Sequence, residues 1–382
     1  ARAPVMGRRR DPSMLPDSYV LDRALAALSP EELREVVRDL LLELDDRAHA
    51  RVTQALVERA ARGNSAWSPG GPSGEVVSSI VAFAAAAAHV GLADPSEVDD
   101  YLQEGSMAIL ARDYPAAREI FRALLVPIND GEIHLGEHET VDEVLGADVA
   151  ACAARYVVAT YMTAPPARRP EAVRAAIAEV SAVAHFWEPL REMERVAVEP
   201  LPHLDGFLPR WRALIEERCG DQGSSEWEEA QWRREVVRRM EGADGLARIA
   251  RSTRRAEDFR AWCRMLVEAR DWRAALSAHE EAAENTIDEL DWRGEFLDGA
   301  ALAAQELGRR DLPSRLERAW RQAPSMLRLT RWLGSAESKA SVRRRAAQAL
   351  EVCPKRARRQ RGLLYLLIGD ISSAAKLLAA AP

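Results

Sequence analysis

Hydrophobic and polar positions repeat with the period of an α-helix over most of this chain. The segment Ser29-Pro30-Glu31-Glu32 has the residues of a helix start, with a capping serine, an early proline and a glutamate that completes a capping box. Apolar residues then recur three and four apart and predict one stripe along the helix: Leu33, Val36, Val37, Leu40, Leu41 and Leu44. Asp94-Pro95-Ser96-Glu97 marks a second start of the same kind. Alternating strand patterns are nearly absent, so the chain is predicted to be all-α.

A short phrase occurs four times along the chain: an aspartate, an apolar residue, and a small residue three positions after the apolar one. The copies are Asp113-Tyr114 with Ala117, Asp271-Trp272 with Ala275, Asp311-Leu312 with the departing Arg315, and Asp370-Ile371 with Ala374. Each copy follows one apolar-periodic helix and precedes another, which is the pattern of a helical hairpin. The phrase therefore predicts stacked helix pairs, and it predicts no particular chemistry.

Two segments rich in Gly, Pro and Ser divide the chain. Residues 64–74 (NSAWSPGGPSG) and 220–225 (GDQGSS) lack helical periodicity and are predicted to be linkers. A further irregular zone is expected from Val126 to Thr140, where prolines and glycines oppose a continuous helix. The predicted parts are an N-terminal helical segment (1–63) and two parts of a solenoid (75–219 and 226–382).

The sequence resembles tetratricopeptide repeats at two places. The matching residues are Gly105, Asp113, Tyr114, Ala117 and Phe121, and then Gly362, Tyr365, Gly369, Asp370, Ile371, Ala374 and Leu378. Between them Asp271, Trp272, Ala275 and Ala282 match, while His279 takes the usual aromatic place. The intervals between phrases are 158, 40 and 59 residues instead of a steady repeat length. The resemblance implies an irregular tetratricopeptide-like α-solenoid of stacked helical hairpins.

A second resemblance is to the helical regions that follow SWIM-type zinc fingers in bacterial proteins. The Cys-x-Cys and Cys-x-His patterns of that finger are absent from this sequence. This resemblance therefore implies a fold and no function.

Composition places the chain among globular proteins, with 47% hydrophobic and 30% charged residues. Its longest apolar run, Ile80 to Val90, is too short to cross a bilayer, so no membrane partner is expected. The basic N-terminal residues precede no stretch of signal-peptide length, and the four cysteines lie far apart. We expect a cytoplasmic protein with reduced cysteines. Its first residue, an alanine, suggests a piece of a longer chain.

Charge is spread unevenly. Residues 309–361 hold 16 Lys and Arg against 4 Asp and Glu, so this segment carries +12 and the rest −19 of the net −7. Candidate polyanion-binding residues are Arg343, Arg344, Arg345, Lys355, Arg356, Arg358, Arg359 and Arg361. On one face they could contact the phosphates of a nucleic acid. A solvated helix face, or an intramolecular match to the acidic N-terminal half of the chain, remains an alternative.

Ten tryptophans are many for 382 residues. Candidate protein-binding residues among them are Trp187, Trp227, Trp232 and Trp292. An exposed tryptophan can anchor a protein or peptide, whereas a buried one fills the gap between helices. Burial decides between the two roles.

Candidate chemistry is sparse. The densest set of potential metal ligands is His134 and His138 with Glu132, Glu137 and Glu139, but Gly136 opposes the helix that would bring the histidines together. The alternative is an acidic surface loop, and no metal site or other cofactor is expected. Neither a nucleophile elbow nor a phosphate-binding loop is present, so we expect no enzyme. The sequence favours a scaffold or adaptor that binds another protein or peptide, with nucleic-acid or polyanion binding as the alternative.

Overall fold

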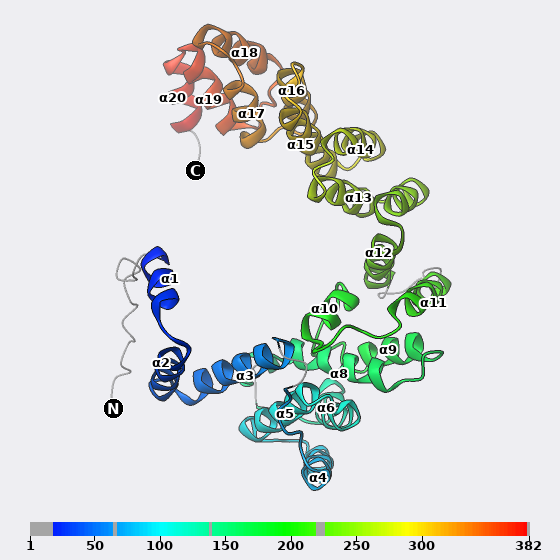
Figure 1. The fold of residues 1–382 in the computed structure, drawn as a ribbon. Helices are drawn as coiled ribbons and strands as arrows, with labels where there is room; N and C mark the ends of the chain where they lie inside the picture. Colours follow the sequence, from blue (N-terminus) through cyan, green and yellow to red (C-terminus); the bar gives the residue numbers. More distant parts are fainter. Residues whose placement is uncertain (1–17, 64–66, 137–139, 219–225, 380–382) are drawn as a thin grey trace. The chain divides into compact units, whose positions relative to one another are not determined.

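A computed structural model describes residues 18–63, 67–136, 140–218 and 226–379 (Figure 1). These residues form helices α1 to α20 and no β-strand; Leu92 and His134 make an isolated bridge. The predicted all-α class is confirmed. The chain divides into two compact units, Ala1–Phe207 and Leu208–Pro382, with the boundary inside α11 (Leu204–Arg218). The linker predicted at 220–225 lies outside the described residues, and the three predicted parts stay a prediction.

The first unit contains ten helices before α11 among its described residues. They are α1 (Ser18–Ala27), α2 (Pro30–Leu42), α3 (Asp46–Gly63), α4 (Gly74–Val90), α5 (Pro95–Leu110), α6 (Tyr114–Asn129), α7 (Val141–Val144), α8 (Val149–Thr163), α9 (Arg169–Ala178) and α10 (Pro189–Val196). The predicted start of α2 is confirmed, because Ser29 and Glu32 form a reciprocal capping box. Asp94 likewise caps α5 by accepting from the Ser96 N–H.

Helix α8 is the centre of the first unit. Every residue from Ala151 to Tyr161 is buried, and α5, α6, α9 and α10 pack around it. Its buried Arg155 is paired: the guanidinium contacts Glu58 of α3 and donates to the Ser106 hydroxyl of α5 at 3.1 Å. A helix apolar on all sides is a core helix, and α8 occupies that position.

The second unit is a series of helices that pack on their neighbours in sequence. They are α12 (Glu226–Thr253), which is broken at Gly242, α13 (Ala256–Glu268), α14 (Trp272–Asn285), α15 (Leu290–Glu306), α16 (Leu312–Gln322), α17 (Met326–Gly334), α18 (Lys339–Val352), α19 (Arg358–Ile368) and α20 (Ile371–Ala379). Two apolar cores follow one another along this series, the first centred on Phe259 and Phe296, the second on Trp320 and Trp332. Packing between sequence neighbours is the arrangement of a solenoid-like fold.

The repeated phrase marks the turns of four helical hairpins: α5–α6, α13–α14, α15–α16 and α19–α20. Each first helix ends with a residue in the left-handed region, and these residues are Arg112, Arg270, Gly308 and Gly369. Each then makes the same two hydrogen bonds of a Schellman motif, as in Asp113 N to Ala108 O and Arg112 N to Ile109 O. The four helix ends thus share one backbone geometry.

The phrase's aspartate is the N-cap of the second helix. Asp113, Asp271 and Asp370 each accept from the backbone N–H three residues on. Asp311 makes no such bond and pairs with Arg315 instead. In this copy the left-handed Gly308 precedes the aspartate by three residues, whereas in the other three copies the left-handed residue comes directly before it. The connection between α15 and α16 is therefore two residues longer and has a different local geometry.

The small residues of the phrase lie where helices meet. Ala117, Ala275 and Ala374 are all buried. Gly105 faces Phe121, and a Cβ built on it would lie 2.9 Å from the ring of that residue. Only a residue without a side chain permits this approach of α5 to α6.

The irregular zone expected from Val126 begins later than predicted. Helix α6 continues to Asn129 with Pro127 inside its last turn. A proline there removes one hydrogen bond near the helix end, where the chain is about to leave the helix anyway. The carbonyl of Pro127 accepts from Glu132 and Ile133, so the exit from the helix is itself hydrogen-bonded.

Candidate functional site

The eight basic residues predicted to bind a polyanion divide into two groups. Arg345 and Arg361 are half-buried and donate to backbone carbonyls. Arg345 reaches Trp332 O at 2.8 Å, in the last turn of α17, and Arg361 reaches Cys353 O at 2.9 Å, at the end of α18. Both guanidinium groups therefore cap the helix that precedes their own, where the carbonyls and the helix dipole favour a cation.

This capping role begins one helix earlier. Arg328 of α17 donates to Ala323 O at 2.9 Å, at the end of α16, and pairs with Asp298 at 2.8 Å. At three successive helix–helix junctions of the second unit, an arginine thus caps the helix that precedes its own. Part of the basic segment therefore has a role in helix packing.

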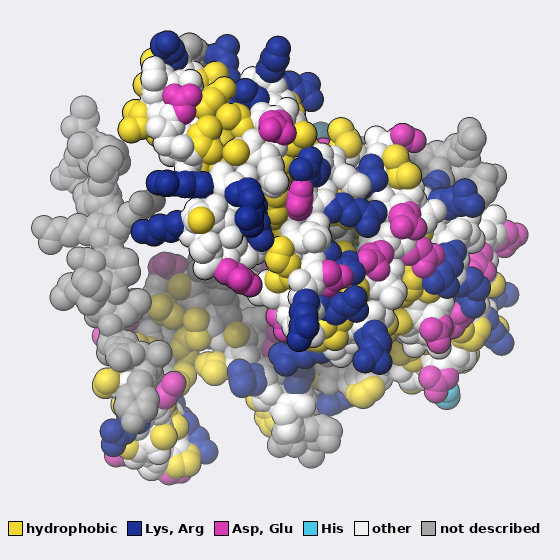
Figure 2. All heavy atoms as spheres, turned by 90° about the horizontal axis from the view of Figure 1, so that it is seen from above, with side chains coloured by type: hydrophobic (Ala, Val, Ile, Leu, Met, Phe, Trp, Pro, Cys, Tyr) yellow, Lys and Arg dark blue, Asp and Glu magenta, His cyan; other side chains and the backbone are white. Residues whose placement is uncertain are grey.

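The other members of the set are exposed. The side chains that make no ion pair or hydrogen bond with any residue that the structure describes are those of Arg343, Arg344, Lys355, Arg356 and Arg359. Arg358 is also exposed. Figure 2 shows more Lys and Arg than Asp and Glu side chains over the C-terminal helices on the face that it presents. The predicted cationic surface is therefore smaller than the sequence segment.

The four candidate tryptophans differ in burial. Trp187 and Trp227 are 45% and 51% exposed. Trp292 is half-buried, stacks on Phe296 and lies under the Arg260 guanidinium. Trp232 is 5% exposed and stacks on Trp211 with ring centroids 5.7 Å apart, so its indole belongs to the core of the second unit.

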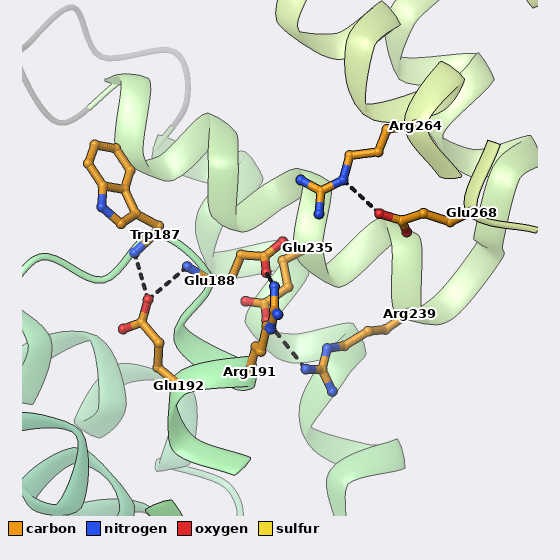
Figure 3. A network of polar contacts seen from close by, with 8 residues as sticks. All are labelled: Trp187, Glu188, Arg191, Glu192, Glu235, Arg239, Arg264 and Glu268. Atoms are coloured by element: carbon orange, nitrogen blue, oxygen red, sulfur yellow. Dashed lines mark hydrogen bonds and ion pairs between the residues drawn. The ribbon is translucent and has the colours of Figure 1, made fainter. Parts of the chain in front are cut away.

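Trp187 stands at the start of α10, where a carboxylate organises the chain (Figure 3). The backbone N–H groups of Trp187 and Glu188 both donate to Glu192 Oε1, at 3.0 and 3.2 Å. Burial raises the pKa of Glu192, against these hydrogen bonds. Figure 3 also draws two ion pairs of the second unit, Glu235–Arg239, in which Glu235 is buried, and the exposed Arg264–Glu268.

Sequence reasoning missed a buried ionic group in the second unit. Asp258 is 1% exposed and accepts from Arg234 Nε and Thr253 Oγ1, both at 2.5 Å. Arg233 lies 3.6 Å from the same carboxylate. The group ties α12 to α13 and has a packing role; no spacing in the sequence distinguishes it from the many exposed charges.

Potential metal ligands do not gather. His134 is exposed, while Glu137, His138 and Glu139 lie outside the described residues. In the part of the chain that the structure describes, no three His, Cys, Asp or Glu side chains lie close enough to hold a metal ion. Burial raises the pKa of the Cys152 thiol and raises that of Cys263 to about 12.

The apolar stripe predicted on α2 is exposed. No residue of this helix is buried. Val36 and Leu40 are 42% and 55% exposed, and Leu44, which follows the helix, is exposed as well. Leu33, Val37 and Leu41 are half-buried. A stripe of this length on one helix is the size of surface that usually packs against another element.

Among the described helices none has both the length and the apolarity needed to span a membrane. The sequence matches no protein-family model, and it matches no curated protein. The candidate surfaces of the first unit are the α2 stripe and Trp187. Those of the second unit are Trp227 and, separately, the exposed basic residues between Arg343 and Arg359.

Proposed function

We propose that this chain is a non-enzymatic helical-repeat scaffold or adaptor that binds another protein or peptide as part of a larger chain or complex. Its hairpins are proposed to be diverged tetratricopeptide-like repeats. The common Schellman turn and the buried Ala117, Ala275 and Ala374 support this relationship. Stacked helical hairpins present long surfaces whose usual use is to hold another chain, so this step from fold to function is an analogy.

The observation behind the proposal is the α2 stripe. Six apolar side chains recur at helical spacing from Leu33 to Leu44, and none of them is buried. Burying a leucine or valine side chain fully contributes about 1.5–3 kcal/mol, so covering even part of this stripe provides substantial binding free energy. An amphipathic helix or another apolar segment of a partner is the ligand that such a face accepts.

The test compares co-purification of partners by two variants from a native lysate treated with nuclease. V36E/L40E places two carboxylates in the stripe, and L302E places one on α15, where Leu302 is 45% exposed. We expect a stoichiometric protein with the parent chain and with L302E, and its loss with V36E/L40E. Both variants should retain the parent's circular dichroism, because the altered side chains are exposed.

Two results would contradict the proposal. One is a stoichiometric protein that V36E/L40E retains as fully as the parent chain. The other is recovery of nucleic acid without any stoichiometric protein when nuclease is omitted.

A further inference from the structure

The second unit has a group of basic side chains that make no ion pair or hydrogen bond within the described residues. We call Arg343 and Arg344 of α18, Lys355 and Arg356 of the following turn, and Arg359 of α19 the basic surface. All five are exposed, and none has an ion-pair or hydrogen-bond partner among the described residues. They remain after Arg345 and Arg361 are assigned to capping.

Other arginines of the second unit form ion pairs with glutamates. Arg251 binds Glu281 through two hydrogen bonds of 2.7 and 2.8 Å, and Arg264 binds Glu268 at 2.7 Å. Glu351 is the acidic residue of α18, and it forms no ion pair with the basic surface. These five side chains form no ion pair that would stabilise the fold, so stability does not explain the basic surface.

The surroundings of the basic surface indicate which ligand it suits. Val352 is the large exposed apolar residue of α18, whereas Trp320 and Trp332 are 1% exposed. Helices α18 and α19 each expose one large apolar residue, Val352 and Leu366, which is less than the apolar centre of a protein interface. Bases of a nucleic acid would find no exposed tryptophan to stack on here. A ligand held by charge alone fits these observations.

We propose that the basic surface binds the phosphate backbone of a nucleic acid without reading its base sequence. Four of its five members are arginines, whose guanidinium groups bind phosphate oxygens through paired hydrogen bonds. Arg343 and Arg344 lie near the start of α18, and Lys355 and Arg356 follow its end, so roughly 14 Å of helix separates the two pairs. Several successive phosphates of one strand can span that length. This site is independent of the α2 stripe, so either proposal can fail while the other holds.

The test is fluorescence anisotropy with two labelled DNA duplexes of unrelated sequence and with labelled polyglutamate. The variant R343Q/R344Q/R356Q/R359Q removes four charges from the basic surface. The matched control R168Q/R195Q/R254Q/R273Q removes four exposed arginines whose side chains likewise make no ion pair or hydrogen bond with the described residues. Both variants change the net charge equally.

We expect the parent chain to bind both duplexes with similar affinity. The surface variant should bind at least about ten-fold more weakly at low salt, and the slope of log K against log salt should fall by up to about 4, because each phosphate contact contributes about one. The control variant should stay close to the parent. Absence of binding at low salt, equal weakening by both variants, or tighter binding of polyglutamate than of DNA would overturn the proposal. The last result would identify an acidic polypeptide as the ligand.

Discussion

At the scale of single residues, His279 shows how packing sets the properties of a side chain. It is buried beside Phe296, and its Nδ1 has no hydrogen-bond partner. A Cβ on Gly299 would lie 2.2 Å from its ring, so the glycine makes room for the imidazole. The resemblance to tetratricopeptide repeats predicts an aromatic residue at position 279, and the imidazole there packs beside the Phe296 ring.

Acid should destabilise the second unit through His279. Burial lowers the pKa of His279 to about 4, whereas an unfolded histidine has a pKa near 6.5, so the unfolded chain binds the proton first. The stabilisation is complete above pH 6.5 and is lost as pH falls toward 4, by about 2 kcal/mol at pH 5. Urea unfolding at pH 7 and pH 5 should show this loss in the parent and not in H279L, beyond the carboxylate effects that both share. Equal losses in the two would refute the explanation.

Gly105 should resist substitution. In G105A the new methyl group would meet the buried Phe121 ring at 2.9 Å, and overpacking of this kind costs about 1–3 kcal/mol, more than the roughly 1 kcal/mol gained from alanine's helix propensity. G206A in α11 is the control, because nothing lies within 4 Å of its Cβ position. Urea unfolding should show G105A less stable and G206A unchanged or more stable than the parent. The reverse order would mean that the α5–α6 approach is looser than described.

At the scale of elements, periodicity and capping residues predicted the helices because both are local signals. The aspartates of the phrase were predicted to mark turns, and three of them cap the following helix. Non-glycine residues in the left-handed region, Arg112 and Arg270, were not predicted, since sequence patterns point to glycine there. The end of α6 was placed too early, because a proline in a last turn does little harm to a helix.

The turn between α13 and α14 should gain stability from glycine. Arg270 has a φ of 55° and is exposed, and its side chain has no partner among the described residues. R270G relieves the left-handed strain and should raise the free energy of unfolding by about 0.5–1 kcal/mol, although glycine's greater freedom in the unfolded chain offsets part of the gain. R270A keeps the strain and should give no increase. A stabilisation by R270A as large as that by R270G would assign the effect to the lost charge.

The capping arginines should matter for stability in a way that the basic surface does not. R361M removes the donors to Cys353 O and Leu350 O and should cost about 1–2 kcal/mol in the free energy of unfolding. R356M, a neighbour without a partner, should cost less than about 0.5 kcal/mol. Thermal melting of the two variants checks this difference, and similar melting temperatures would contradict the assignment of Arg361 to capping.

At the scale of the whole molecule, the all-α, sequentially packed fold could be predicted from the sequence, but the exposure of the side chains on its surfaces could not. The α2 stripe was visible as a pattern, yet periodicity is the same for a core face and for an exposed one. Eight basic residues were grouped by their closeness in sequence, and only contacts between helices separate Arg345 and Arg361 from the exposed members. Trp232 and Trp227 are likewise five residues apart in sequence but differ tenfold in exposure.

The most direct test of the scaffold proposal is photo-crosslinking from the α2 stripe. A photoreactive phenylalanine analogue replaces Leu40, and in a matched chain it replaces Leu302, which has similar exposure on α15. In native lysate, position 40 should crosslink one protein in stoichiometric yield, which added V36E should abolish, and position 302 should not. Crosslinking with the same pattern and yield at both positions, or none at position 40, would contradict a role of the stripe in binding a protein partner.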